Sequence, residues 1–455
     1  MQVPVSTPNR CIAGMIGLLL AAWPLSSMAQ DVAYSDIHNS LNHGVVGATR
    51  AYSLGTRTCN ISDVSLSWVN NGTPAVAFNM YKLTNERLTQ IGMSWVKTAC
   101  CVAKSTNALC GTSCSGAGFG LRPHCMDTYD AGWNSSQPRL GPRSGINPFA
   151  ATFSALPGGG GDAIFRRLQM AQTDLSNAGG VQHFVDGVYV CTEEASMPTQ
   201  RNNASYRRVT VDQSTFNLTV QGSTQIGIPG MRAWRDHGLG ANTPDTSVTV
   251  DVLDVPGEGR FWYANKVANL GGGNYRYDYA IYNLNSDVSG GSFSVPVPMG
   301  ATISNIGFNA PLYHSGEPYS NAVWTNPATP CKVKWQSPQT FFENANTNAL
   351  RWGTMYNFWF EIDRAPVMGT VELGLFKPHS PQSIAFTAQV PQKCSFAMGD
   401  VDTNSVVNGD DIRHLVNCLL SGSSPGGDCN CGDMNLLDCV DPADIPSFTS
   451  TVISQ

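Results

Sequence analysis

The chain has 455 residues, of which 13% are charged and 42% hydrophobic, with 45 Gly and 27 Pro. This hydrophobic content is ordinary for a globular protein, and the composition excludes a disordered chain, a collagen and a coiled coil. The net charge of −6 argues against a nucleic-acid partner, because nucleic-acid binding needs a basic surface. The length is sufficient for two or three domains.

The N-terminal segment has the pattern of a secretory signal peptide. Arg10 precedes an apolar run at 11–23, and the small residues Ser27 and Ala29 stand at −3 and −1 of a cleavage site. Thirteen helical residues rise about 20 Å, which is less than the roughly 30 Å hydrocarbon core of a membrane. We therefore expect 1–29 to be a signal peptide and the mature chain to be secreted or held at the cell surface, without a membrane span.

Thirteen of the fourteen cysteines follow this segment. Export to an oxidising compartment favours disulfides over metal binding, although the sequence does not fix their connectivity. Because thirteen is odd, one thiol is expected to be free or to pair between chains. A zinc site is the alternative for one cluster, which lacks the paired CxxC spacing of zinc-binding modules. Its members are Cys100, Cys101, Cys110, Cys114, His124 and Cys125.

Residues 30–200 are predicted to form a disulfide-containing β-rich domain, because short apolar segments alternate there with turn residues. Segments 80–83 and 88–97 lie on either side of the turn residues Thr84-Asn85-Glu86 and indicate a hairpin. One helix is predicted at 162–175. Asp162 would be its N-cap, and Ile164, Leu168, Ala171 and Leu175 follow at helical spacing.

Residues 201–393 are predicted to form an antiparallel β-sandwich domain, because regular alternating segments are separated by Gly, Pro and Asn turns. The segments are 206–211, 216–220, 247–252, 261–270, 275–282, 356–362, 371–376 and 385–390. Their alternating aromatic residues are expected to pack in the core or across strands. A carbohydrate-binding platform is the alternative, and it would need Trp262, Tyr282 or Trp359 to face outward.

The C-terminal tail, residues 394–455, contains nine Asp, no Glu and one Arg. Crowded carboxylates repel one another, and a bound cation would relieve this repulsion. The first twelve-residue stretch, loop 1 (400–411), has the oxygen spacing of an EF-hand-type loop that holds Ca²⁺ at about 2.4 Å. Positions 1, 3, 5, 7, 9 and 12 are Asp400, Asp402, Asn404, Val406 (through its main-chain carbonyl), Asn408 and Asp411.

A second copy, loop 2 (433–444), begins thirty-three residues later. Asp433, Asn435, Asp441 and Asp444 occupy its positions 1, 3, 9 and 12. Position 5 is Leu437, so a ligand is missing unless the neighbouring Asp438 replaces it, and we expect weaker calcium binding here. A helix with an apolar stripe is predicted after each loop. The stripes are Ile412, Leu415, Val416 and Leu419, then Ile445, Phe448, Thr449 and Val452.

These two loop–helix repeats resemble a type I dockerin over residues 398–454. The resemblance implies a small α-helical module that folds on calcium and binds a cohesin-like or other surface protein. Such modules are often appended to secreted polysaccharide-degrading enzymes. Two features depart from the family pattern: Ser405 replaces the usual glycine at position 6, and Gly409-Asp410 and Pro442-Ala443 replace the pairs that contact cohesin. Three prolines within 377–393 favour a tail that is separable from the body, residues 30–393.

The body contains no catalytic motif that the sequence identifies, and its catalytic residues, if any, stay unknown. No acid pair is assigned among its available glutamates, which are Glu193, Glu194, Glu258, Glu317, Glu343, Glu361 and Glu372. We therefore predict a mainly β exported protein of non-catalytic surface or matrix type, attached to a protein partner through its calcium-binding tail. The alternative is a dockerin-bearing carbohydrate-active protein, either a glycoside hydrolase or a sugar binder.

Overall fold

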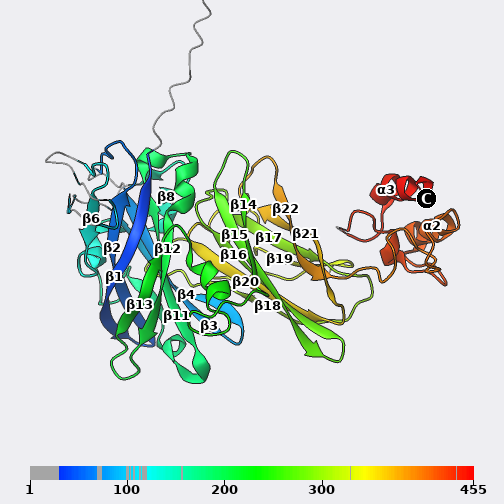
Figure 1. Cartoon of the computed structure of the whole chain (residues 1–455), viewed down its shortest axis with the longest axis horizontal. Coiled ribbons are helices and arrows are strands. Elements are labelled where there is room, and N and C mark those ends of the chain that lie inside the picture. Colours follow the sequence, from blue (N-terminus) through cyan, green and yellow to red (C-terminus); the bar gives the residue numbers. More distant parts are fainter. Residues whose placement is uncertain are drawn as a thin grey trace, which may run out of the picture.

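The structure is a computed structural model, and strands make up most of its regular structure (Figure 1). It describes residues 30–454 apart from 69–73, 99–101, 103, 106–107, 112–113, 115–119, 155–156, 328 and 437. The predicted signal peptide and two of the clustered cysteines, Cys100 and Cys101, lie outside these residues. All pairings between named strands are antiparallel, which confirms the mainly β, antiparallel fold class.

The N-terminal sheet has the strand order β13-β12-β11-β3-β4-β10-β2-β6-β5, with β1 on β2 and β7 on β4. Its strands are β1 (Val32–Val46), β2 (Thr49–Asn60), β3 (Ala75–Thr84), β4 (Arg87–Thr98), β5 (Lys104–Ser105), β6 (Met126–Tyr129), β7 (Leu140–Gly141), β10 (Leu168–Ala171), β11 (Gln182–Val190), β12 (Ala204–Val211) and β13 (Leu218–Gln225). The predicted hairpin is β3–β4, and its turn residues Asn85 and Glu86 have φ of 49° and 62°, as a type I′ turn requires. β12 and β13 follow residue 200, so this sheet uses chain on both sides of the predicted boundary.

The N-terminal sheet curls so that β1, its first strand in the sequence, lies against β13, its last strand in the sequence. The Ile37 N–H of β1 donates to Thr224 Oγ1 of β13 at 3.0 Å, and Ser40 Oγ donates to the Leu218 carbonyl at 2.9 Å. Side chains from both strands enter one core, including Ile37 and Leu218. A separate two-stranded pair, β8 (Ile146–Asn147) and β9 (Thr152–Phe153), lies outside the sheet.

Two further sheets share a second core. The five-stranded sheet has the order β14-β15-β16-β20-β18, and the four-stranded sheet has the order β19-β17-β21-β22. The strands are β14 (Thr249–Asp254), β15 (Arg260–Gly271), β16 (Asn274–Asn283), β17 (Gly290–Pro296), β18 (Ile303–Asn309), β19 (Lys332–Gln336), β20 (Thr354–Ile362), β21 (Pro366–Leu375) and β22 (Ser383–Pro391). Phe293 of the four-stranded sheet packs against Tyr279 and Phe358 of the five-stranded sheet, with ring centroids 5.3 and 5.0 Å apart.

The opposite face of the five-stranded sheet packs on the N-terminal sheet. Tyr282 of β16 lies in one core with Tyr81 and Phe184. The fully buried Arg143 side chain joins these layers, because it donates to the main-chain carbonyls of Ser94 at 2.7 Å and Gly353 at 2.8 Å. Both faces of β16 are therefore covered by protein, as its run of aromatic residues requires.

The helix predicted at 162–175 is wrong. Residues 163–166 form a turn, β10 follows, and η4 (Gln172–Leu175) is a short 3-10 helix. β10 pairs with both β2 and β4, and Leu168 and Leu175 are buried in the core. Ile164 is only half-buried and Ala171 is exposed, so the helical spacing of these apolar residues did not mark one buried face.

The structure contains five disulfides among the described residues, as is typical of proteins that mature in an oxidising compartment outside the cytoplasm. They are Cys59–Cys110, Cys114–Cys125, Cys331–Cys439, Cys394–Cys431 and Cys418–Cys429. They confirm the expected disulfides and exclude the alternative zinc site for Cys110, Cys114 and Cys125, whose sulfur atoms are in disulfide bonds. Cys191 is buried with a free thiol.

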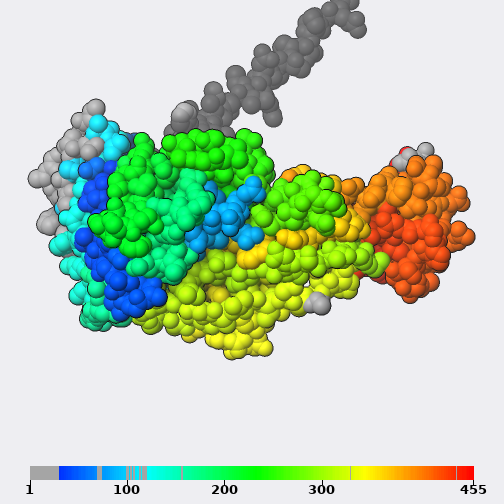
Figure 2. Space-filling view, turned by 90° about the horizontal axis from the view of Figure 1, so that it is seen from below, coloured from blue at the N-terminus to red at the C-terminus, as the bar shows by residue number. Residues whose placement is uncertain are grey.

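The tail forms a lobe at one end of the molecule, beyond the four-stranded sheet (Figures 1 and 2). Its helices are α2 (Asp411–Ser421), η9 (Cys429–Gly432), η10 (Pro442–Asp444) and α3 (Ile445–Ile453). In the body, η8 (Gly230–Arg232) and α1 (Ala233–Asp236) cover the core between the N-terminal and five-stranded sheets. No helix in the part of the chain that the structure describes is long and apolar enough to cross a membrane.

Candidate metal centre

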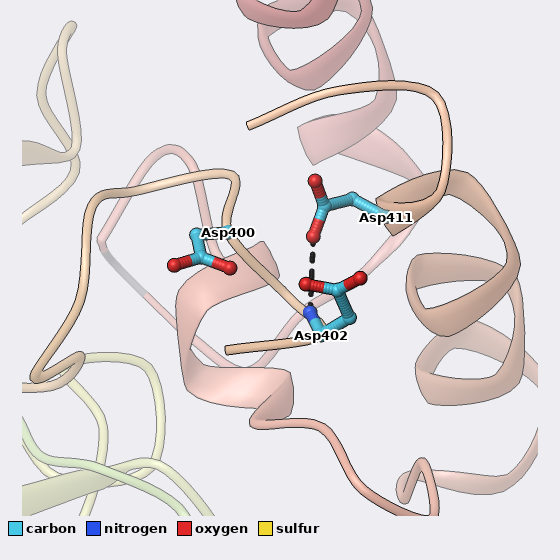
Figure 3. Close-up of side chains that lie close together, drawn as sticks. All are labelled: Asp400, Asp402 and Asp411. Atoms are coloured by element: carbon cyan, nitrogen blue, oxygen red, sulfur yellow. Dashed lines mark hydrogen bonds between the residues drawn. The ribbon is translucent and has the colours of Figure 1, made fainter. Parts of the chain in front are cut away.

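Three carboxylates of loop 1 converge at the start of α2 (Figure 3). One oxygen each from Asp400, Asp402 and Asp411 lies within 4.8 Å of the others. Asp400 and Asp411 are fully buried, and Asp402 is half-buried. Such a set of hard, negatively charged oxygens is the donor chemistry that Ca²⁺ prefers.

Main-chain N–H groups orient two of these carboxylates. Asp411 accepts from the N–H of Asp402 at 3.0 Å and of Asn408 at 2.9 Å. Asp400 accepts from the N–H of Asn404 at 3.0 Å and of Ser405 at 2.9 Å. Ser405 has φ of 70°, so position 6 adopts the left-handed conformation that favours glycine, the residue it replaces.

The other predicted ligands of loop 1 have different partners in this structure. Asn404 Oδ1 accepts from the Val406 N–H at 2.8 Å, and its amide nitrogen donates to Asp402 Oδ2 at 2.9 Å. Asn408 Oδ1 accepts from the Asp410 N–H at 2.6 Å. Three of the six predicted ligand residues thus meet, and a cation would require Asn404 to present its oxygen to the centre instead of its nitrogen.

Loop 2 repeats the backbone arrangement of loop 1. Asp444 at position 12 accepts from the N–H of Asn435 at 3.0 Å and of Asp441 at 2.9 Å, as Asp411 does from positions 3 and 9 of loop 1. Asp441 also accepts from the Ala443 N–H at 2.7 Å and caps η10. The internal duplication inferred from the sequence is therefore visible in matching hydrogen bonds.

Position 1 distinguishes the two loops. Asp433 accepts from the Leu436 N–H at 2.9 Å through one oxygen, and its other oxygen pairs with the Lys393 ammonium. The same ammonium donates to the main-chain carbonyl of Asp438. The Lys393 and Asp433 side chains are only 3% and 1% exposed. Burial raises the pKa of the Asp433 carboxyl, and the ammonium opposes that rise.

Loop 2 is also the part of the tail that attaches to the body. Cys439 at position 7 is bonded to Cys331, which directly precedes β19, and Asp438 pairs with Lys332. Nearby, the Met299 N–H donates to Asn430 Oδ1 at 2.7 Å. The expected separable tail is wrong in this respect, because a disulfide and buried contacts join it to the four-stranded sheet.

The apolar stripes predicted on the tail helices are only partly correct. Leu415 of α2 and Phe448 of α3 are buried in the tail core with Val401. Ile412 and Val416 are 49% and 43% exposed. His414 and Cys418 are buried on α2 in their place, because the Cys418–Cys429 bond turns that face of the helix inward.

The glutamates considered for catalysis in the body bind main-chain N–H groups at several positions. Glu194 is buried, accepts from the Val32 N–H at 2.8 Å, and has a pKa raised to about 8 by burial. Glu317 accepts from the N–H of Arg143 and of Ser144, both at 2.9 Å. Such bonds fix loops and strand ends.

The aromatic residues considered for a carbohydrate platform do not form one outward row. Tyr282 is fully buried. Trp262 packs against the core beneath the five-stranded sheet, and the ring of Trp359 is covered by the Arg87 guanidinium at 3.9 Å. The side chains on this strand face therefore serve packing.

Lys393 and Cys331 are the tail contacts that sequence reasoning missed. One signal was present: the tail has five cysteines, so at least one had to pair outside it in a fully oxidised chain. Nothing in the loop pattern pointed to Lys393, which precedes the first tail cysteine and lies seven residues before loop 1.

No family model matches the chain, and no curated protein matches it. Among solved structures, it is similar to a biofilm associated protein B domain at a TM-score of 0.15 and 10% identity, covering 88% of this chain and 93% of that one. A biofilm associated protein BSP domain gives a TM-score of 0.13 and 9% identity, covering 90% and 67%. At these TM-scores neither likeness supports an inference about fold or function.

Proposed function

We propose that the chain is an exported, non-catalytic β-protein of surface or matrix type whose tail binds one Ca²⁺ in loop 1. In this proposal the body is a β-sandwich of the five- and four-stranded sheets, packed on the curled N-terminal sheet. The convergence of Asp400, Asp402 and Asp411 at the start of α2 carries the calcium assignment. Three carboxylates held this close repel one another unless a cation or protons compensate them.

The remaining ligands of loop 1 are available without a change of fold. Asn404 is exposed and Asn408 half-buried, so both side chains can turn toward the centre, and the Val406 carbonyl is at the position that EF-hand-type loops use. With the three carboxylates, these groups supply the six oxygen ligands that Ca²⁺ needs as a minimum.

The attachment role rests on the surface of α2. Loop 2 faces the body, whereas Ile412, Val416 and Leu420 of α2 are 49%, 43% and 82% exposed. A calcium ion at loop 1 would fix the first turn of this helix and thereby order the surface for a protein partner. A cohesin-like partner is one member of this class, although positions 10 and 11 differ from the dockerin pattern.

Calcium titration of the chain from residue 30 tests this proposal. Calorimetry should show saturable binding at loop 1, and the Asp400→Ala variant should bind Ca²⁺ far more weakly. The neighbouring Asp410→Ala variant is the matched control, because Asp410 is exposed and is not a predicted ligand. Absence of saturable binding by the unmodified chain at millimolar Ca²⁺ would refute the calcium assignment.

A pocket in the body favours a second candidate, carbohydrate binding. It has a volume of about 540 Å³, and its lining includes Phe341, Phe342, Gln336 and Gln382. Phe342 is 85% exposed. An exposed aromatic ring beside side-chain amides suits the apolar face and hydroxyl groups of a sugar. A glycan array probed with the chain and with Phe342→Ala tests this candidate, and it fails if both give the same signals.

A further inference from the structure

We propose that the Lys393 ammonium is the resident cation of loop 2, so that the tail binds a single Ca²⁺ although it carries two loops. This inference deepens the proposed function, because it rests on loop 1 as the calcium site. It also assigns loop 2 a different role: a metal-independent attachment of the tail to the body.

The position of the ammonium supports this assignment. Lys393 Nζ contacts the carboxylate at position 1 of loop 2 and the main-chain carbonyl at position 6, Asp438. Position 1 is a metal-ligand position of an EF-hand-type loop, and the position 6 carbonyl directly precedes the ligand carbonyl of position 7. Asp400, at position 1 of loop 1, instead accepts only main-chain N–H groups in the bonds that the structure defines.

The burial of Lys393 and Asp433 strengthens their dependence on each other. Side chains that are 3% and 1% exposed have lost nearly all contact with water, and an isolated buried charge is strongly unfavourable. Among the residues that the structure describes, Asp433 accepts only one main-chain N–H, so a positive partner supplies most of the stabilisation that this carboxylate has. A lysine that is part of the chain supplies it without depending on the free calcium concentration.

The composition of loop 2 agrees with a monovalent occupant. Position 5 is Leu437, and position 7 is Cys439, which is bonded to Cys331. Ca²⁺ takes six to eight oxygens, so without a side-chain ligand at position 5 loop 2 would need water molecules to complete the set and would bind Ca²⁺ more weakly than loop 1 does. An ammonium, in contrast, is satisfied by three acceptors. Lys332 of the body adds a second positive charge, through its ion pair with the Asp438 carboxylate of the same loop.

The test is the number of calcium ions bound by the chain from residue 30, measured by equilibrium dialysis against CaCl₂ and by calorimetry. The unmodified chain should bind one ion. Lys393→Gln removes the ammonium and retains a polar side chain, so this variant should bind a second ion at loop 2. Its melting temperature should fall in chelator and recover when Ca²⁺ is added.

Two further variants make the outcome specific. Lys332→Gln removes the lysine of the more exposed Lys332–Asp438 pair, and this variant should still bind one ion. The double variant Lys393→Gln/Asp433→Asn removes both charges and should fold without rescue by Ca²⁺ and bind one ion. If Lys393→Gln alone does not fold, folding of this double variant supports the pairing role.

Other results would overturn the inference. Two ions bound by the unmodified chain would mean that Ca²⁺ displaces Lys393. Retention of one ion by Lys393→Gln, without destabilisation in chelator, would mean that loop 2 does not need a cation. If the unmodified chain binds no ion and Lys393→Gln binds one, the loop 1 proposal fails while the role of Lys393 stands.

Discussion

In both loops of the tail, the carboxylate at position 12 accepts main-chain hydrogen bonds from positions 3 and 9, with distances of 2.9 and 3.0 Å. At position 1 the loops diverge. Asp400 lies with two further carboxylates, whereas Asp433 pairs with a buried lysine that comes from outside its loop. The same backbone turn therefore surrounds different charged groups in the two loops. The difference comes from a residue outside the twelve-residue pattern, Lys393.

The largest expected effect is that of Asp433→Ala. It leaves the Lys393 ammonium buried without its carboxylate, and removing one partner of a buried ion pair costs about 3–5 kcal/mol. The tail should melt at lower temperature with and without Ca²⁺, while the number of bound ions stays at one. Differential scanning calorimetry and calcium titration of one preparation measure both quantities. A tail of unchanged stability would contradict the buried pair.

Removal of the disulfide between body and tail should have the second-largest effect on the stability of the tail. In the Cys331→Ser/Cys439→Ser variant, the stability of the tail should fall by about 2–4 kcal/mol, since this bridge closes a long loop of chain. Limited proteolysis near residue 393 should accelerate, whereas calcium binding at loop 1 should persist. The body variant Cys114→Ser/Cys125→Ser is the control and should leave proteolysis of the tail unchanged.

Asp400→Ala tests the role of loop 1, the other member of the comparison. Loss of one carboxylate ligand should weaken calcium binding by about 100-fold, which corresponds to about 2.7 kcal/mol. In chelator this variant should lose less stability than Asp433→Ala, because it loses two main-chain hydrogen bonds but leaves no buried counter-charge behind. The opposite result would be an unchanged affinity for Ca²⁺ with a large loss of stability in chelator. It would show that loop 1 is a structural turn and not a calcium site.

The smallest effect is expected for Ser405→Gly. The φ of 70° at this position is unfavourable for a serine, and glycine relieves it while adding freedom to the unfolded chain. The calcium-free tail should gain at most about 1 kcal/mol, measured by denaturant unfolding in chelator. The corresponding change at Thr403, where φ is 62°, is a matched comparison within loop 1. A loss of stability would show that the serine side chain is needed.

Local patterns predicted much of the fold. The turn at Asn85 and Glu86 and the strand containing Tyr279 could be found because turn residues and period-two alternation act within a few residues. The false helix at 162–175 shows the limit of this reasoning. Its apolar spacing satisfied a helix, but pairing with β2 and β4, which are distant in sequence, decided its conformation.

For the candidate metal centre too, only the part that depends on residues close in sequence could be predicted. Loop 1 could be predicted because its carboxylates are close in sequence and turn around a single point. The occupant of loop 2 could not, because Lys393 lies forty residues before Asp433 and meets it only when the tail folds onto the end of β22. The odd number of tail cysteines was compatible with a bond to the body, but the bond to Cys331 was not predicted because it depends on the three-dimensional fold.

The attachment of loop 2 has a mechanical consequence. The tail leaves the body by the main chain after β22 and by the Cys331–Cys439 bond next to β19, and these two strands are the opposite edges of the four-stranded sheet. A partner that pulls on α2 would therefore load both edges of the sheet together. Tension would be shared across the width of the body, and peeling of a single edge strand, the weakest response of a sheet to force, would be avoided.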